Sequence, residues 1–171
     1  MFDVSSISWG PNGSTLAVGY GKWNHTSWCE DQSVVSIWCI FRRDFDHDKS
    51  NVNIDVGSCV TSLAFHPSNP SILAGGTFNG EIYLCDFFKN DPVICVSRID
   101  EFYHWEAVTQ LLWITHKMYG GYQNVHYLIS TSTDGKIMVW EESSKLEYPL
   151  KGHLMARKKK NELRIVGGTC L

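Results

Sequence analysis

Apolar and polar residues alternate along several short stretches of the chain, at the two-residue period of a β-strand. The stretch HYLISTSTDGKIMVWEE, residues 126–142, shows this alternation on both sides of an Asp-Gly pair. Asp-Gly favours a tight turn because glycine adopts positive φ angles without steric cost. The stretch therefore predicts a β-hairpin.

This hairpin belongs to a threefold repeat. The segments VSSISW, VTSLAF and VTQLLW start at Val4, Val60 and Val108, and all have the pattern apolar-x-x-apolar-x-aromatic. Two more alternating strands follow each segment, with Asn79-Gly80 and Asp134-Gly135 between them in the second and third sets. The fourth candidate strands are VNIDV (52–56), PVICVS (92–97) and LEYPL (146–150). Such a repeat predicts four-stranded blades of a β-propeller.

The repeat is longer than the roughly 40–45 residues of a WD-type blade. The three starting valines are 56 and 48 residues apart. Comparing strand positions places ten extra residues in the first blade, around GKWNHTSWCEDQ (21–32), and seven in the third, around THKMYGGYQN (115–124). Both insertions fall between predicted strands, where loops tolerate added residues.

We therefore expect an all-β fold, an incomplete WD-repeat propeller over residues 1–171 with blade cores at about 4–41, 60–88 and 108–142. The final GGTCL resembles the start of a fourth innermost strand, at 166–171. A closed ring needs about four to eight blades, and three blades leave open sheet edges. The sequence thus indicates part of a longer propeller.

Four residues of the third blade, His104, Ser130, Asp134 and Trp140, have the spacing of the hydrogen-bond network of WD-repeat blades. In that arrangement the aspartate fixes the imidazole, the imidazole reaches the serine, and the serine satisfies the buried indole N–H. A hydrolase triad is the alternative, but no Gly-x-Ser-x-Gly motif surrounds Ser130. The matching positions of the second blade hold Gly75, Asn79 and Cys85.

The bulk composition narrows the function classes. Hydrophobic residues make up 43% of the chain and its net charge is -3, so we expect a folded protein that does not bind nucleic acid. We find no signal peptide and no apolar run of about 18 residues, so no membrane insertion is expected. The six cysteines form no CxxC pair and lack histidines at zinc-ligand spacing. We expect reduced, mostly buried thiols and no catalytic, cofactor-binding or metal-binding residues.

The insertion in the first blade holds the candidate partner surface. Tyr20, Lys22, Trp23 and Trp28 are assigned to it because aromatic residues are enriched at binding hot spots. In the alternative interpretation, these rings fold back over the propeller edge. The basic run ARKKKNE (156–162) predicts a solvated loop or, alternatively, a contact with an acidic partner.

Two longer stretches indicate a family. HPSNPSILAGGTFNGEIYLCDF (66–87) and the following HYLISTSTDGKIMVW resemble the WD-repeat propeller of the dynein intermediate chains. The first blade, LAVGYGKWNHTSWCEDQSVVSIWCIFRRDF (16–45), is similar to the dynein 2 branch of that family, which serves retrograde intraflagellar transport. The chain departs from the family at Cys85, where the family has tryptophan.

The resemblance implies a non-catalytic scaffold subunit of a dynein motor complex. Its implied partners are the dynein heavy chain and another dynein intermediate chain, and its implied location is the cytoplasm and cytoskeleton, at the cilium or ciliary base. Light-chain binding is not carried over, because the family's light-chain segments lie in an N-terminal region that this chain lacks. The alternatives are another cytoplasmic or axonemal dynein intermediate chain, a general WD-repeat scaffold outside dynein, or a propeller enzyme.

Overall fold

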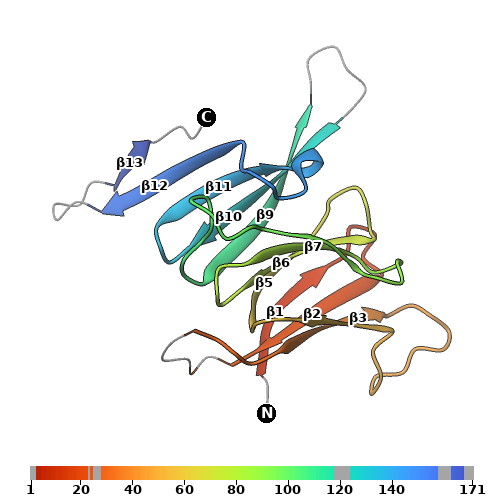
Figure 1. Ribbon diagram of the computed structural model, residues 1–171. Helices are drawn as coiled ribbons and strands as arrows, with labels where there is room; N and C mark the ends of the chain where they lie inside the picture. The colour runs from red at the N-terminus through yellow and green to blue at the C-terminus, as the bar shows by residue number, and fades with distance from the viewer. Residues whose placement is uncertain (1–2, 23, 25–27, 118–123, 158–162, 168–171) are drawn as a thin grey trace.

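The strand repeat folds as three antiparallel sheets that lie one beyond the other, with the two termini at opposite ends (Figure 1). The computed structural model describes residues 3–22, 24, 28–117, 124–157 and 163–167. The all-β prediction is confirmed. Asn79-Gly80 and Asp134-Gly135 form turns as predicted, with φ angles of 87° at Gly80 and 82° at Gly135.

The first two sheets each have four strands in chain order. The first sheet contains β1 (Asp3–Trp9), β2 (Thr15–Gly21), β3 (Ser33–Cys39) and β4 (Val52–Val56). The second sheet contains β5 (Val60–Phe65), β6 (Ile72–Thr77), β7 (Ile82–Asp86) and β8 (Val93–Val96). Alternating valine, isoleucine and leucine positions favour these strands because branched side chains pack well on a pleated surface.

The third sheet has five described strands instead of four. It contains β9 (Val108–Lys117), β10 (Asn124–Ser132), β11 (Lys136–Glu141), β12 (Lys151–Arg157) and β13 (Leu163–Gly167). Strands β9 and β10 extend into the predicted insertion at 115–124, which lengthens their hairpin. The predicted basic loop begins inside β12, and its residues 158–162 lie outside the described residues.

The predicted fourth strand at 146–150 is wrong. A short 3-10 helix, η1 (Glu142–Ser144), precedes a turn in which Lys145 and Leu146 have φ angles of 49° and 60°. Pro149 lacks the N–H that a strand ladder uses, which disfavours pairing there. The fourth strand is β12 instead. Within the described residues, no helix has the length and apolar character needed to cross a bilayer.

The predicted opening of a fourth blade at 166–171 also differs from the structure. Strand β13 ends at Gly167 and pairs antiparallel with β12, so it extends the third sheet. This pairing gives partners to backbone N–H and C=O groups along the edge of β12. The remaining residues, 168–171, lie outside the described residues.

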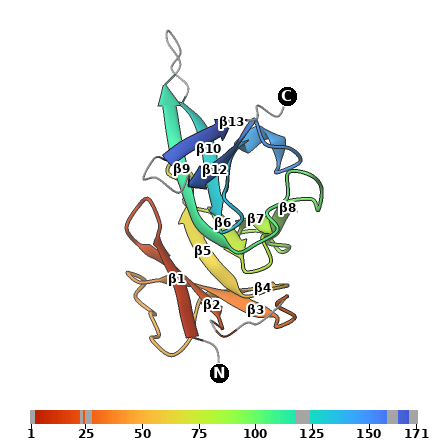
Figure 2. The same cartoon turned by 90° about the vertical axis from the view of Figure 1, so that its left-hand side faces the viewer.

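Neighbouring sheets contact each other along their first strands, β1, β5 and β9, as Figure 2 shows from the side. Ser6 and Ser62 hold the same position in the repeat. The Ser6 hydroxyl oxygen accepts a hydrogen bond from the Leu63 N–H at 3.0 Å, and the Ser62 hydroxyl oxygen accepts one from the Leu111 N–H at 2.9 Å. The two sheet junctions are thus built by the same polar contact.

An apolar contact repeats in the same way. Val60 of β5 packs on Gly19 of β2, where a Cβ would come 2.6 Å from the valine Cγ1. Val108 of β9 packs on Gly76 of β6, with a corresponding distance of 2.5 Å. Since Gly19 and Gly76 occupy equivalent positions, each junction places the valine that starts one sheet over a glycine of the preceding sheet.

The repeated motif is buried in two sheets and exposed in the first. The valine and leucine of the motif are at most 6% exposed in β5 and β9: Val60, Leu63, Val108 and Leu111. In β1 the corresponding Val4, Ile7 and Trp9 are 57%, 59% and 54% exposed. Two buried clusters form the core, one between the first and second sheets and one between the second and third.

Candidate functional site

The structure brings the four network residues of the third sheet together. Trp140 Nε1 donates a hydrogen bond to Ser130 Oγ at 2.9 Å, and Ser130 Oγ lies 2.8 Å from His104 Nε2. His104 Nδ1 faces Asp134 Oδ1 at 3.5 Å without a hydrogen bond between the two atoms. Trp140, Ser130 and His104 are all buried, so solvent does not compete for these contacts.

Burial sets the protonation of this network. It lowers the pKa of His104, against the opposing effect of the Asp134 carboxylate, so the imidazole is neutral near pH 7. With its proton on Nδ1 facing Asp134, the other ring nitrogen accepts the Ser130 O–H, whose oxygen accepts the Trp140 N–H. Ser130 is 0% exposed and committed to these partners, which argues against the hydrolase alternative.

Asp134 also shapes the turn between β10 and β11. Its carboxylate oxygens accept backbone hydrogen bonds from the Lys136 N–H at 2.8 Å and the Trp105 N–H at 3.2 Å. The second of these bonds ties the turn to the segment that carries His104. The aspartate therefore positions the histidine through the backbone of the segment that carries it.

The second sheet fills the corresponding space without a network. A Cβ on Gly75 would come 2.0 Å from Tyr83 Cζ, so the tyrosine ring occupies the volume that Ser130 uses in the third sheet. Burial raises the pKa of Tyr83 well above its usual value. Cys85 stands where Trp140 does, and burial raises the pKa of this thiol to about 12. Both side chains therefore remain neutral.

Asn79, which matches Asp134 in the repeat, has a different role. Its amide exchanges two hydrogen bonds with the Cys29 backbone, donating to the carbonyl at 2.8 Å and accepting from the N–H at 2.8 Å. The backbone carbonyl of Asn79 accepts a hydrogen bond from the Tyr103 hydroxyl at 3.0 Å. The turn of the second sheet thus holds the insertion of the first sheet and the segment before β9.

The predicted partner residues of the first sheet are spread over different environments. Trp28 is 56% exposed, and Tyr20 is half-buried on β2. Lys22 Nζ forms an ion pair with Asp31 Oδ1 at 2.8 Å. Trp23 lies outside the described residues. Of the described aromatic residues in this set, Trp28 is the one that the structure leaves open to solvent.

A hollow of about 270 Å³ adjoins Trp28. Ile99, which is 69% exposed, and Tyr103 line it from the segment before β9. Trp105, 57% exposed, contacts the Tyr103 ring with centroids 5.6 Å apart. Exposed apolar side chains from two distant segments therefore gather around one hollow. The sequence did not reveal this surface, because Ile99 has no motif that marks it.

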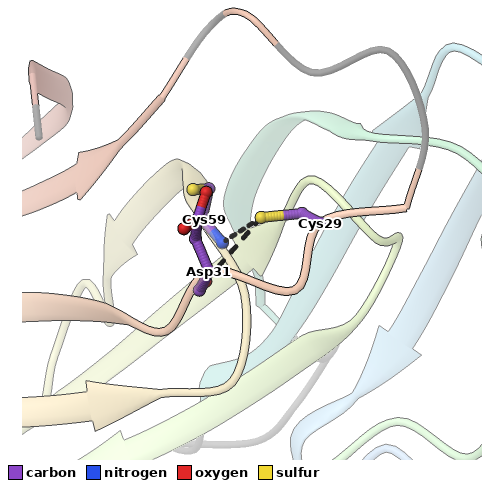
Figure 3. A group of neighbouring side chains, drawn as sticks. All are labelled: Cys29, Asp31 and Cys59. Carbon is purple, nitrogen blue, oxygen red and sulfur yellow. Dashed lines mark hydrogen bonds between the residues drawn. The ribbon is translucent and has the colours of Figure 1, made fainter.

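Sequence reasoning also missed a side-chain cluster beside the hollow. Cys29, Asp31 and Cys59 lie next to one another (Figure 3), and one ligand atom from each lies within 4.8 Å of the others. The residues come from the connection between β2 and β3 and from the segment just before β5. Two cysteines that are 30 residues apart give no spacing signal, which is why the sequence predicted no metal ligands.

Comparison with known proteins finds homologues of the chain. The family described as "WD domain, G-beta repeat" matches residues 44–86. Cytoplasmic dynein 2 intermediate chain 2 of Homo sapiens is 34% identical over 139 residues, which are 81% of this chain. The chain is homologous to the WD-repeat dynein intermediate chains. Cytoplasmic dynein 1 intermediate chain of Drosophila melanogaster is 31% identical over 80% of this chain, and Dynein intermediate chain 3, ciliary, of Heliocidaris crassispina is 26% identical over 96%.

The chain spans about a quarter of the length of the curated proteins it matches. The share is 25% for the human dynein 2 protein and 26% for the Heliocidaris crassispina protein. The alignment with the Heliocidaris crassispina protein runs through all three sheets, because it includes 167 residues. The family prediction from the sequence is thus confirmed.

Proposed function

We propose that this chain forms part of the propeller of a dynein 2 intermediate chain and docks on the dynein heavy chain as a non-catalytic scaffold. One observation supports the choice of dynein 2: identity is 34% and 33% to the human and mouse dynein 2 proteins, and 31% or less to the other dynein intermediate chains compared. The role that we propose is retrograde intraflagellar transport at the cilium.

The docking surface that we propose is the rim of the hollow, which Trp28 and Ile99 line, extended by Trp105 through its contact with Tyr103. These side chains are 56%, 69% and 57% exposed, although each is large and apolar. Exposed aromatic side chains around a concave centre are typical of binding hot spots. The double hydrogen bond between Asn79 and Cys29 fixes the hollow in place, so little ordering cost would oppose binding.

A second exposed apolar surface lies on β1, and we propose that it contacts another blade. The exposed motif of β1 is equivalent to surfaces that pack on a preceding sheet in β5 and β9. We infer that Val4, Ile7 and Trp9 pack on a further blade when the propeller is closed. The rim of the hollow remains open in that arrangement and is available to the heavy chain.

Affinity purification from ciliated cells tests the assignment. A tagged propeller containing this chain should co-purify dynein 2 heavy-chain peptides, and loss of the gene should stall retrograde transport, with cargo accumulating at ciliary tips. The variant Trp28→Ala/Ile99→Ala should lose most heavy-chain peptides. Phe88→Ala is the matched control, because Phe88 is 77% exposed at the opposite end of β7.

The alternatives predict different results. A general WD-repeat scaffold would co-purify ubiquitin-ligase or kinase subunits instead of heavy-chain peptides. Another dynein branch would co-purify a dynein 1 or axonemal heavy chain and leave ciliary tips normal. Either result would overturn the dynein 2 assignment. Equal heavy-chain recovery by the double variant and the control would overturn the docking surface alone.

A further inference from the structure

The cluster of Cys29, Asp31 and Cys59 contains potential metal ligands that the proposed scaffold function does not require. We propose that it binds a thiophilic divalent cation, Zn²⁺ by preference, which clips the insertion of the first sheet to the start of β5 (Figure 3). Two cysteine sulfurs and a carboxylate oxygen are ligands that zinc takes in proteins. Cys29 and Cys59 are each 1% exposed, so the ligands are already desolvated.

The three side chains lie close enough together to bind one metal ion. The three ligand atoms lie within 4.8 Å of one another. Tetrahedral zinc with Zn–S bonds of about 2.3 Å separates two sulfurs by roughly 3.8 Å, so small shifts would close the site. A disulfide needs its sulfurs at about 2.05 Å and would not involve Asp31. Zinc employs all three residues, and water from the adjoining hollow could occupy the fourth position.

Backbone N–H groups donate to both sulfurs, and the Cys29 thiol donates to the Asp31 backbone carbonyl at 3.7 Å. The Cys59 N–H donates to Cys29 Sγ at 3.5 Å, and the Lys22 N–H donates to Cys59 Sγ at 3.3 Å.

Zinc is bound by cysteine as the thiolate, so binding by the two cysteines would release their protons. Lys22, whose ammonium lies 2.8 Å from Asp31 Oδ1, is the cation now beside the cluster. It would compete with the metal for the carboxylate.

Cobalt titration of the purified 171-residue chain tests the site. Co²⁺ bound by thiolates gives a sulfur-to-cobalt charge-transfer band, and displacement of that band by Zn²⁺ reports relative affinity. We expect one equivalent of Co²⁺ to give the band. Cys29→Ser and Cys59→Ser should abolish it, Asp31→Asn should weaken binding, and Lys22→Met should strengthen it. Cys39→Ser, on β3 and outside the cluster, should bind as the original chain does.

Protection from alkylation gives a second readout that does not depend on a variant that folds poorly. Bound Zn²⁺ should slow the alkylation of Cys29 and Cys59 in the unaltered chain and leave that of Cys39 unchanged. The proposal is overturned if the reduced chain shows no thiolate band and no protection. It is equally overturned if the band persists in both Cys29→Ser and Cys59→Ser, or if the two cysteines are isolated as a disulfide that binds no metal after reduction.

Discussion

Strands β1 and β5 carry the same motif, yet their surroundings are opposite. Leu63 of β5 is 6% exposed within the cluster between the first and second sheets, whereas the equivalent Ile7 of β1 is 59% exposed. The difference arises from position in the stack, since each motif faces the preceding sheet. The motif therefore encodes a contact between neighbouring blades, and we infer that its exposed copy in β1 is a surface for contact with a further blade.

The largest expected effect comes from shortening the two equivalent side chains. Leu63→Ala should lower the free energy of unfolding by about 2–5 kcal/mol, because it leaves a cavity between two sheets. Ile7→Ala should change it by less than about 0.5 kcal/mol, because its side chain is exposed in this chain. Denaturant unfolding at several protein concentrations measures both. Similar losses would mean that the β1 face is covered, and a concentration dependence would identify the cover as a second copy.

A slightly smaller effect should follow from filling the glycine at a sheet junction. Gly76→Ala places a Cβ 2.5 Å from Val108 Cγ1, so we expect a loss of about 1–3 kcal/mol from overpacking. Gly57→Ala is the control, since a Cβ there meets nothing within 4 Å. Adding Val108→Ala to Gly76→Ala should cost less than the two single changes together. Simple additivity, measured by thermal unfolding, would refute the junction contact.

The second and third sheets also differ at equivalent positions, because the third sheet has a hydrogen-bond network and the second has none. His104→Ala should lower stability by about 1–3 kcal/mol, because Ser130 and Asp134 lose a buried partner. Asp134→Ala should act similarly, and the double variant should cost less than the sum. His47→Ala, at a side chain that is 84% exposed, serves as the control. Additive losses for His104 and Asp134 would show that the two residues act independently.

The smallest effect is a pH dependence specific to the third sheet. Burial lowers the pKa of His104 in the folded chain, whereas an unfolded histidine titrates near 6.5. Below about pH 6.5 the unfolded state therefore binds more protons, so stability is fully present above this pH and falls as the pH decreases. The slope contributed by one histidine is at most about 1.4 kcal/mol per pH unit. His104→Gln should make the measured slope shallower, and an unchanged slope would contradict the assignment.

The sequence was most informative where local chemistry decides the structure. Strands such as Ile72–Thr77 follow from the two-residue alternation, and the turns at Gly80 and Gly135 follow from the need for positive φ. The spacing of His104 and Trp140 predicted a set of residues that the structure brings together, because both positions are fixed relative to one hairpin.

The sequence was least informative where distant segments meet. Cys29 and Cys59 come together because two loops from different sheets converge, and no local pattern records that convergence. Strand β12 was missed because KGHLMAR mixes charged and apolar residues without alternation. The second sheet has Tyr83 packed on Gly75 where the third sheet has the Ser130 network. This difference depends on the volume between strands, which the pattern of apolar and polar residues does not reveal.

The most direct test of the account is the binding of a purified dynein 2 heavy-chain tail to the propeller. We predict that a propeller closed with further blades binds the tail, and that the 171-residue chain alone binds poorly because its first motif face is uncovered. Trp28→Ala/Ile99→Ala in the closed form should weaken binding, while Phe88→Ala should not. Binding of the closed form at background level would contradict the proposed function.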